Sequence, residues 1–133
     1  MRKVISTERA PGAVGPYSQA IVAGGFVWCS GQIPLDPSTG QLVQGEIEDE
    51  ARQVLSNLRA VLDAAGSSLD RVVRATVYLA DLSDFERVNA VYAESFGDQP
   101  PARVCIEACG LPKGARVEID AIAEIEGASG SGS

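Results

Sequence analysis

One segment in the last third of the chain combines residue types that could act on a small carboxylate. In residues 103–107 (RVCIE), the two-residue period of a strand places Arg103, Cys105 and Glu107 on one open polar face. Pro101 fixes how the chain enters this strand. Arginine suits a carboxylate because its planar fork donates two parallel hydrogen bonds and stays protonated. Arg103 is therefore a candidate anion-binding residue, and the alternative is a surface arginine paired with Glu107 or another carboxylate.

Glu118, Asn89 and Cys105 each have a simple structural explanation. In residues 117–121 (VEIDA), alternation places Glu118 and Asp120 opposite the apolar positions, as on a solvated strand face. Asn89 interrupts the polar face of the second predicted helix, where solvation alone would explain it. Cys105 is typical of a small, inert strand residue, since no histidine is present to activate it as a nucleophile.

Two turns beside N-terminal strands could approach a ligand. Residues 15–19 (GPYSQ) and 30–34 (SGQIP) have the glycine and proline pattern of turns, which by itself explains them. A sharper hypothesis is that Gly31 lets a ligand approach the backbone. The hydroxyls of Tyr17 and Ser30 would then orient that ligand.

Composition excludes several classes of function. The chain contains no histidine, which removes Ser-His-Asp, Cys-His and HExxH chemistry. Its three cysteines are an odd number, so we expect reduced thiols, and they include no CxxC pair, so we expect no metal site. Nothing in the chain indicates a cofactor. The formal charge of -7 opposes binding to nucleic acid, which requires clustered lysine and arginine. No run of about 20 apolar residues is present, so we expect no membrane segment and a cytoplasmic protein.

The pattern of apolar residues predicts one α+β domain over residues 1–126. Two helices are expected, at 48–65 before Gly66 and from Ser83 to Gly97, the second with a capping box of Ser83 and Glu86. Strands are expected at 3–6, 18–22, 26–30, 72–79, 103–109 and 117–125, with a turn at 23–25 and the order βββαβαββ. Residues 127–133 contain only glycine, alanine and serine, which is typical of an engineered flexible linker.

The predicted sheet has one face that its own helices cannot cover. Two helices suffice for one face of six strands, and strand 72–79 alternates apolar residues at Val73, Ala75, Val77 and Leu79. Oligomerisation in a closed ring would cover the other face and place sites in clefts between subunits.

Five separated motifs occur together in one known family, and the chain resembles that Rid (reactive intermediate deaminase) or YjgF family over residues 1–126. The motifs are 15–20 (GPYSQA), 30–34 (SGQIP), 81–89 (DLSDFERVN), 101–107 (PARVCIE) and 111–113 (LPK) leading to 117–119 (VEI). The resemblance implies a chorismate-mutase-like subunit, a six-stranded mixed sheet with two helices on one face, and a homotrimeric barrel with clefts between subunits.

The resemblance also implies a reaction. Members hydrolyse 2-aminoacrylate and related 2-enamines or 2-imines, such as 2-iminopropanoate and 2-iminobutanoate, to 2-keto acids and ammonia, and deaminating members have the arginine found here as Arg103. Arg103 would bind the substrate carboxylate, and Glu118 would position or activate water. Gly31 and Cys105 would line the pocket. Tyr17, Ser30 and Asn89 are further candidates for substrate binding.

The family resemblance leaves other functions open. Some members lack deaminase activity, so a non-catalytic module that binds small carboxylates through the same arginine is the main alternative. An RNA-directed role is disfavoured by the negative charge and the missing histidines. The linker-like tail also raises the hypothesis of an engineered trimeric building block within a larger assembly.

Overall fold

The computed structural model describes residues 1–125 as a single mixed sheet with two helices. The predicted tail at 127–133, and the predicted domain end at 126, lie outside the described residues. The elements follow the order βββαβαββ, close to the expected bounds. They are β1 (Lys3–Ile5), β2 (Ala20–Ala23), β3 (Phe26–Gln32), α1 (Ile47–Ala64), β4 (Val72–Leu79), α2 (Phe85–Phe96), β5 (Ala102–Glu107) and β6 (Val117–Glu124), with short 3-10 turns at η1 (Leu69–Arg71), η2 (Leu82–Asp84) and η3 (Pro112–Gly114).

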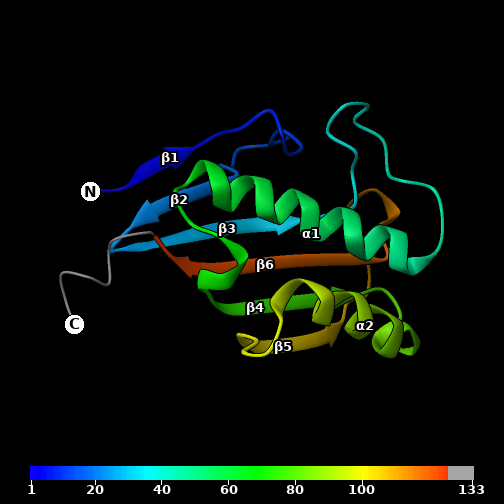
Figure 1. Ribbon diagram of the computed structural model, residues 1–133. Helices are drawn as coiled ribbons and strands as arrows, with labels where there is room; N and C mark the ends of the chain where they lie inside the picture. The colour runs from blue at the N-terminus through cyan, green and yellow to red at the C-terminus, as the bar shows by residue number, and fades with distance from the viewer. Residues whose placement is uncertain (126–133) are drawn as a thin grey trace.

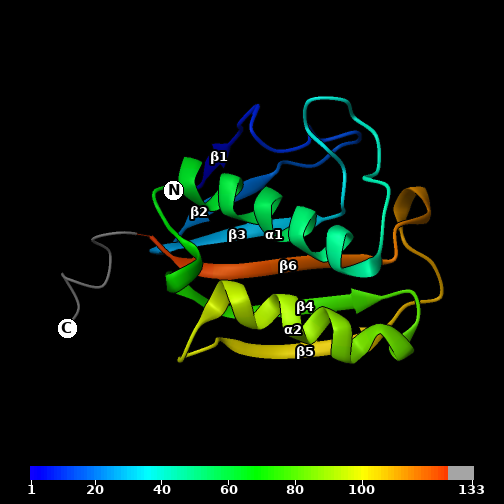
Figure 2. The same ribbon diagram turned by 45° about the vertical axis from the view of Figure 1, so that its right-hand side comes forward.

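The strands lie in the order β1-β2-β3-β6-β4-β5, which makes β1 and β5 the edges of the sheet. Strands β1 to β3 form an antiparallel meander, and β4 with β5 is the only parallel pair within residues 1–125. Gly24 and Gly25 form the predicted hairpin turn with φ of 64° and 85°, a conformation that L side chains rarely adopt. Both helices cover the same face of the sheet (Figures 1 and 2).

Helix α1 packs because its apolar residues recur along one side. Ala51, Val54, Leu58 and Val61 are fully buried against the sheet, and a buried side chain of the size of valine or leucine contributes about 1.5–3 kcal/mol. Glu46 and Asp49 form a capping box at the start of the helix. The helix ends as expected before Gly66, whose φ is 80°.

The predicted capping box at the start of α2 is wrong. Instead of an exchange between Ser83 and Glu86, the carboxylate of Asp81 accepts a hydrogen bond from the Ser83 amide at 2.8 Å. The chain then passes through η2 before α2 begins at Phe85. Ser83 therefore lies inside η2, and the side chain that caps this turn belongs to Asp81.

The predicted alternation in β4 holds except at Val73. A register shift between Val72 and Arg74 inserts a bulge beside β6. Val72 is buried and Val73 is 40% exposed, so Val73 does not share the buried face of Ala75. Strand β6 follows the expected alternation without interruption.

The face of the sheet opposite the helices exposes large apolar side chains. We call this surface the bare face and define it by Val4, Trp28, Val104 and Ile106, all of which are more than a third exposed. Each of these residues alternates with positions that point toward the helices. The structure thus contains the uncovered apolar surface that the sequence predicted.

Candidate functional site

Arg103 points toward α2, and not onto an open polar face. Strands β4 and β5 pair Ala75 with Arg103 and Val77 with Cys105, and both β4 residues are buried beneath the helices. Residues paired across neighbouring strands point to the same side of a sheet. The expectation of an open polar face on β5 is therefore wrong, because α2 covers that side of the strand (Figure 2). Arg103 and Cys105 are half-buried there, whereas Val104 and Ile106 are exposed on the other side.

The guanidinium of Arg103 is held by neutral groups. Its Nη1 donates a hydrogen bond to Asn89 Oδ1 at 2.6 Å. Its Cζ lies 4.8 Å from the centroid of the Tyr92 ring and 5.5 Å from that of Phe85. Within residues 1–125, Arg103 makes no ion pair. The Glu107 carboxylate instead accepts a hydrogen bond from the Leu82 amide at 2.8 Å.

These contacts decide between the explanations that the sequence left open. The interpretation of Arg103 as a surface arginine paired with a carboxylate is wrong, and so is that of Asn89 as a merely solvated residue. A guanidinium with no carboxylate partner keeps its full charge for an anionic ligand.

Cys105 neighbours Arg103 on the same side of β5 and is half-buried. Burial raises the pKa of its thiol, and the positive charge of Arg103 opposes that rise. A thiol with a raised pKa remains protonated near neutral pH. This agrees with the interpretation of Cys105 as a lining residue and not a nucleophile.

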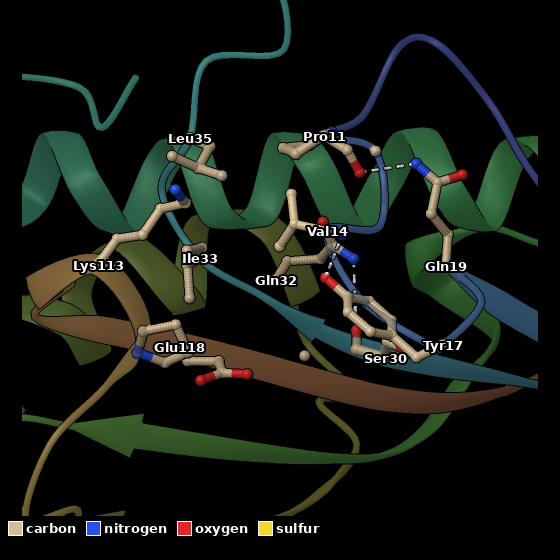
Figure 3. A pocket seen from close by; sticks show the side chains of 13 residues that line it. Pro11, Val14, Tyr17, Gln19, Ser30, Gln32, Ile33, Leu35, Lys113 and Glu118 are labelled. Atoms are coloured by element: carbon tan, nitrogen blue, oxygen red, sulfur yellow. Dashed lines mark hydrogen bonds between the residues drawn. The ribbon is translucent and has the colours of Figure 1, made fainter. Parts of the chain in front are cut away.

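A cleft of about 380 Å³ lies at the end of β3, next to β6, and we call it the Glu118 cleft. It brings together four predicted site residues, Tyr17, Ser30, Gly31 and Glu118, and the close-up shows the Glu118 carboxylate directed toward the side where Tyr17 and Ser30 lie (Figure 3). The remaining lining residues are Pro11, Gly12, Val14, Gln19, Gln32, Ile33, Leu35, Pro112 and Lys113.

Gly31 is required where the side chain of Glu118 crosses the backbone of β3. A Cβ at position 31 would overlap Glu118 Oε2, so any side chain there would displace the carboxylate. The absence of a side chain thus sets where the Glu118 carboxylate lies.

The surroundings of Glu118 favour its protonated form. Burial raises the pKa of this carboxyl group, and the negative charge of Asp120 raises it further. Ser30 Oγ donates to the Ser18 carbonyl at 2.6 Å, and Tyr17 Oη accepts from the Val14 amide at 3.4 Å. Both hydroxyl oxygens can still accept a hydrogen bond from a ligand.

Gln19 and Lys113 are two polar residues of the cleft that were not among the predicted site residues. Gln19 is only 5% exposed, and its side chain forms hydrogen bonds with backbone groups of the loop that precedes it. Lys113 lines the cleft with a φ of 58°, unusual for a residue with a Cβ. Gln19 lies in motif 15–20 and Lys113 in motif 111–113, but neither residue type by itself indicates that its side chain lines a cleft.

Arg103 and Glu118 do not meet within one chain. Glu118 pairs with Tyr78 on the face opposite the helices, whereas Arg103 lies on the helix side of edge strand β5. Their backbones are separated by two strand spacings and three residues, roughly 14 Å. Asn89 and Cys105 lie with Arg103, and Tyr17, Ser30 and Gly31 lie with Glu118.

Residues 1–125 contain neither a cluster of metal-binding side chains nor a membrane-spanning helix. No group of three or more His, Cys, Asp or Glu side chains is arranged to hold a metal ion. Neither helix in this part of the chain has both the length and the apolar character needed to cross a membrane.

Comparison with known proteins gives close relatives over nearly the whole chain. The sequence model of the family described as endoribonuclease L-PSP matches residues 7–125. A RutC family protein of Pyrococcus horikoshii is 56% identical over 123 residues, which cover 92% of this chain and 98% of that protein. The 2-iminobutanoate/2-iminopropanoate deaminase of Homo sapiens is 50% identical over 123 residues, which cover 92% of this chain and 90% of the human protein.

Solved structures share the fold. The structure of TdcF from E. coli, determined with bound serine, superimposes with a TM-score of 0.86 at 42% sequence identity. The match covers 92% of this chain and 98% of TdcF.

Proposed function

The chain belongs to the endoribonuclease L-PSP family, also called the YjgF or Rid family, and on that premise we propose that it is a deaminase that hydrolyses 2-imino acids and 2-enamino acids to 2-keto acids and ammonia. The observation that carries the proposal is Arg103, which is positioned by neutral groups and has no carboxylate partner within residues 1–125. Relatives named 2-iminobutanoate/2-iminopropanoate deaminase at about 50% identity support the same substrate class.

The reaction depends more on orienting the substrate and a water molecule than on a strong acid or base. An enamine such as 2-aminoacrylate takes a proton on its terminal carbon and becomes the imine. Water then adds to the imine carbon, and the resulting carbinolamine loses ammonia to leave the keto acid. Holding the substrate and a water molecule in the right geometry can supply much of the acceleration, which is consistent with a site that contains no histidine.

The two groups of residues have complementary roles in this proposal. Arg103 binds the substrate carboxylate through two parallel hydrogen bonds, with Asn89 and Cys105 beside it. Glu118, when ionised, accepts a proton from the attacking water and then returns it to the departing amine, and burial together with the charge of Asp120 raises the pKa of this carboxyl group. Tyr17, Ser30 and Gly31 line the cleft around that carboxylate.

A site that uses both Arg103 and Glu118 requires two copies of the chain. The two side chains lie on opposite faces of the sheet in one subunit, and the bare face offers an apolar surface on which another copy can pack. We therefore place the site between subunits of a homotrimer, in which one copy supplies Arg103 and its neighbour supplies Glu118. We further propose that the protein is a cytoplasmic hydrolase that acts on a C–N bond.

The test couples a pyridoxal-phosphate-dependent dehydratase acting on threonine or serine to this protein and follows the loss of the imine. We expect the wild-type protein to accelerate that loss and Arg103→Ala to abolish the acceleration. Binding of a 2-keto acid without any acceleration would instead select the module that binds carboxylates. Acceleration that survives in Arg103→Ala would overturn the assigned role of the arginine.

A further inference from the structure

Helix α2 places three uncharged side chains on the guanidinium of Arg103. Phe85, Asn89 and Tyr92 recur at spacings of four and three residues, so they share one stripe of the helix. The amide oxygen of Asn89 accepts a hydrogen bond from Nη1 of Arg103. The rings of Phe85 and Tyr92 come before and after Asn89 along the stripe, and both contact the guanidinium. Taking the proposed function as given, we propose that these three residues form a neutral cradle that positions Arg103 while leaving its charge available to the substrate carboxylate.

The cradle is rigid at its inner end. The Tyr92 ring is packed on the ring of Phe96, with 4.4 Å between centroids, and Tyr92 is only 5% exposed. A cation over an aromatic face is attracted by the electron density of the ring, most strongly where water is excluded. Tyr92 thus gives the guanidinium a fixed platform, and Phe85, which is 38% exposed, covers it from the solvent side.

The cradle also leaves the hydrogen-bonding edge of Arg103 free. A guanidinium has five N–H donors, and the side chain of Arg103 uses only Nη1 toward acceptors in residues 1–125. The Nε and Nη2 donors remain for a carboxylate, which accepts two parallel bonds from such an edge. Phe85, Asn89 and Tyr92 are therefore positioning residues, and Arg103 is the group that touches substrate.

The neutral side chain of Asn89 allows a positioning role to be distinguished from a purely structural one. An aspartate at position 89 would hold the guanidinium at least as firmly, because a charged acceptor makes the stronger hydrogen bond. It would also neutralise the charge that the substrate requires. A structural role predicts that Asn89→Asp is harmless, and the cradle predicts that it impairs binding.

Calorimetry with 2-oxobutanoate, a stable 2-keto acid, tests the inference without turnover. We expect Asn89→Asp to weaken binding roughly ten- to a hundred-fold, the cost of losing a charged hydrogen-bonding partner. In the imine assay the same variant should raise KM and leave kcat nearly unchanged. Unweakened binding in Asn89→Asp would overturn the cradle, as would a wild-type protein that fails to bind 2-oxobutanoate.

A matched pair at Tyr92 tests the aromatic platform. The Tyr92 hydroxyl is buried and has no partner in residues 1–125, so Tyr92→Phe keeps the ring and should bind 2-oxobutanoate as the wild type does. Tyr92→Leu removes the ring and should weaken binding roughly five- to thirty-fold. Equal weakening in both variants would show that the hydroxyl matters and not the ring.

These measurements separate the inference from the proposed function. Thermal unfolding shows whether each variant is folded, and Asn89→Asp with Tyr92→Phe keeps the test decisive if Tyr92→Leu does not fold. A wild-type protein that binds 2-oxobutanoate but leaves the rate of imine loss unchanged would refute the deaminase. The binding affinities of the variants would still decide whether the cradle exists.

Discussion

The two charged residues of the proposed site are held in opposite ways. Arg103 is surrounded by neutral partners that do not reduce its charge. Glu118 lies in a cleft where burial and the nearby Asp120 both disfavour its ionised form. An arginine that keeps its charge and a carboxyl group that can exchange a proton are the two properties that hydrolysis of an anionic imine requires.

Replacing Asp120 by asparagine should shift the pH dependence of the reaction. In the proposed mechanism the ionised form of Glu118 is the base, so kcat/KM should rise with pH through the raised pKa of this group. Asp120→Asn removes one of the two causes of that rise, and the acidic limb of the pH profile should move to lower pH. The asparagine oxygen can still accept the hydrogen bond from Tyr78 Oη, 3.0 Å away in the wild type.

The control for this prediction is Glu118→Gln, which cannot ionise. It should lower kcat/KM roughly a hundredfold and remove the acidic limb altogether. An acidic limb that persists in Glu118→Gln would assign the base to another group.

At the scale of elements, one buried side chain organises the loop between β1 and β2. Gln19 Oε1 accepts from the Thr7 amide at 2.7 Å, and Nε2 donates to the carbonyls of Thr7 and Pro11 at 3.1 and 2.8 Å. This loop supplies Pro11 and Tyr17 to the Glu118 cleft. Gln19 thus connects the stability of the loop to the shape of the site.

Gln19→Leu should lower the free energy of unfolding by about 2–3 kcal/mol, because it leaves several backbone groups without partners away from water. It should also weaken binding of 2-oxobutanoate. Denaturant unfolding at fixed chain concentration measures the first effect and calorimetry the second. The exposed Gln44 offers a control, and Gln44→Leu should stay within about 0.5 kcal/mol of the wild type. Equal stability of the two variants would contradict the role given to Gln19.

At the scale of the whole molecule, the bare face is the feature that a single chain leaves unexplained. Trp28 is 48% exposed and Ile106 is 44% exposed on the surface opposite the helices. Uncovered apolar side chains gathered on one face mark a surface that binds another protein. In the proposed trimer, a second and third copy of the chain cover this face and bring Arg103 of one subunit to the Glu118 cleft of the next.

Ile106→Asp should therefore reduce the mass in solution from that of three chains, about 42 kDa for chains of 13.9 kDa, to that of one. A charged side chain cannot be buried in an apolar interface without a large cost. Imine hydrolysis should be lost together with the trimer. Light scattering measures the mass, and Ala90→Asp on the exposed side of α2 is the control. A wild-type mass of one chain would refute the trimer, and a mass well above three chains would indicate a larger assembly.

The sequence by itself determined the secondary-structure elements and the residue types available to the proposed site. Alternation and helical periodicity depend on local geometry, so the strands and both helices could be predicted close to their bounds. The exceptions were the bulge at Val73 and the start of α2 at Phe85. The bulge depends on pairing with β6, and the start of α2 depends on a hydrogen bond from the Ser83 amide to the Asp81 carboxylate, so hydrophobic periodicity indicates neither. The motifs with Arg103 and Glu118 also identified the family, which the comparisons confirmed.

Only the tertiary structure decided which of these residues are neighbours. Strand order places β5 at an edge and β6 inside the sheet, and no pattern within either strand contains that information. The fold therefore put Arg103 under α2 beside Asn89 and Tyr92, and put Glu118 on the opposite face beside Gly31. Alternation says that two residues lie on opposite faces of one strand, but packing alone decides which face is covered.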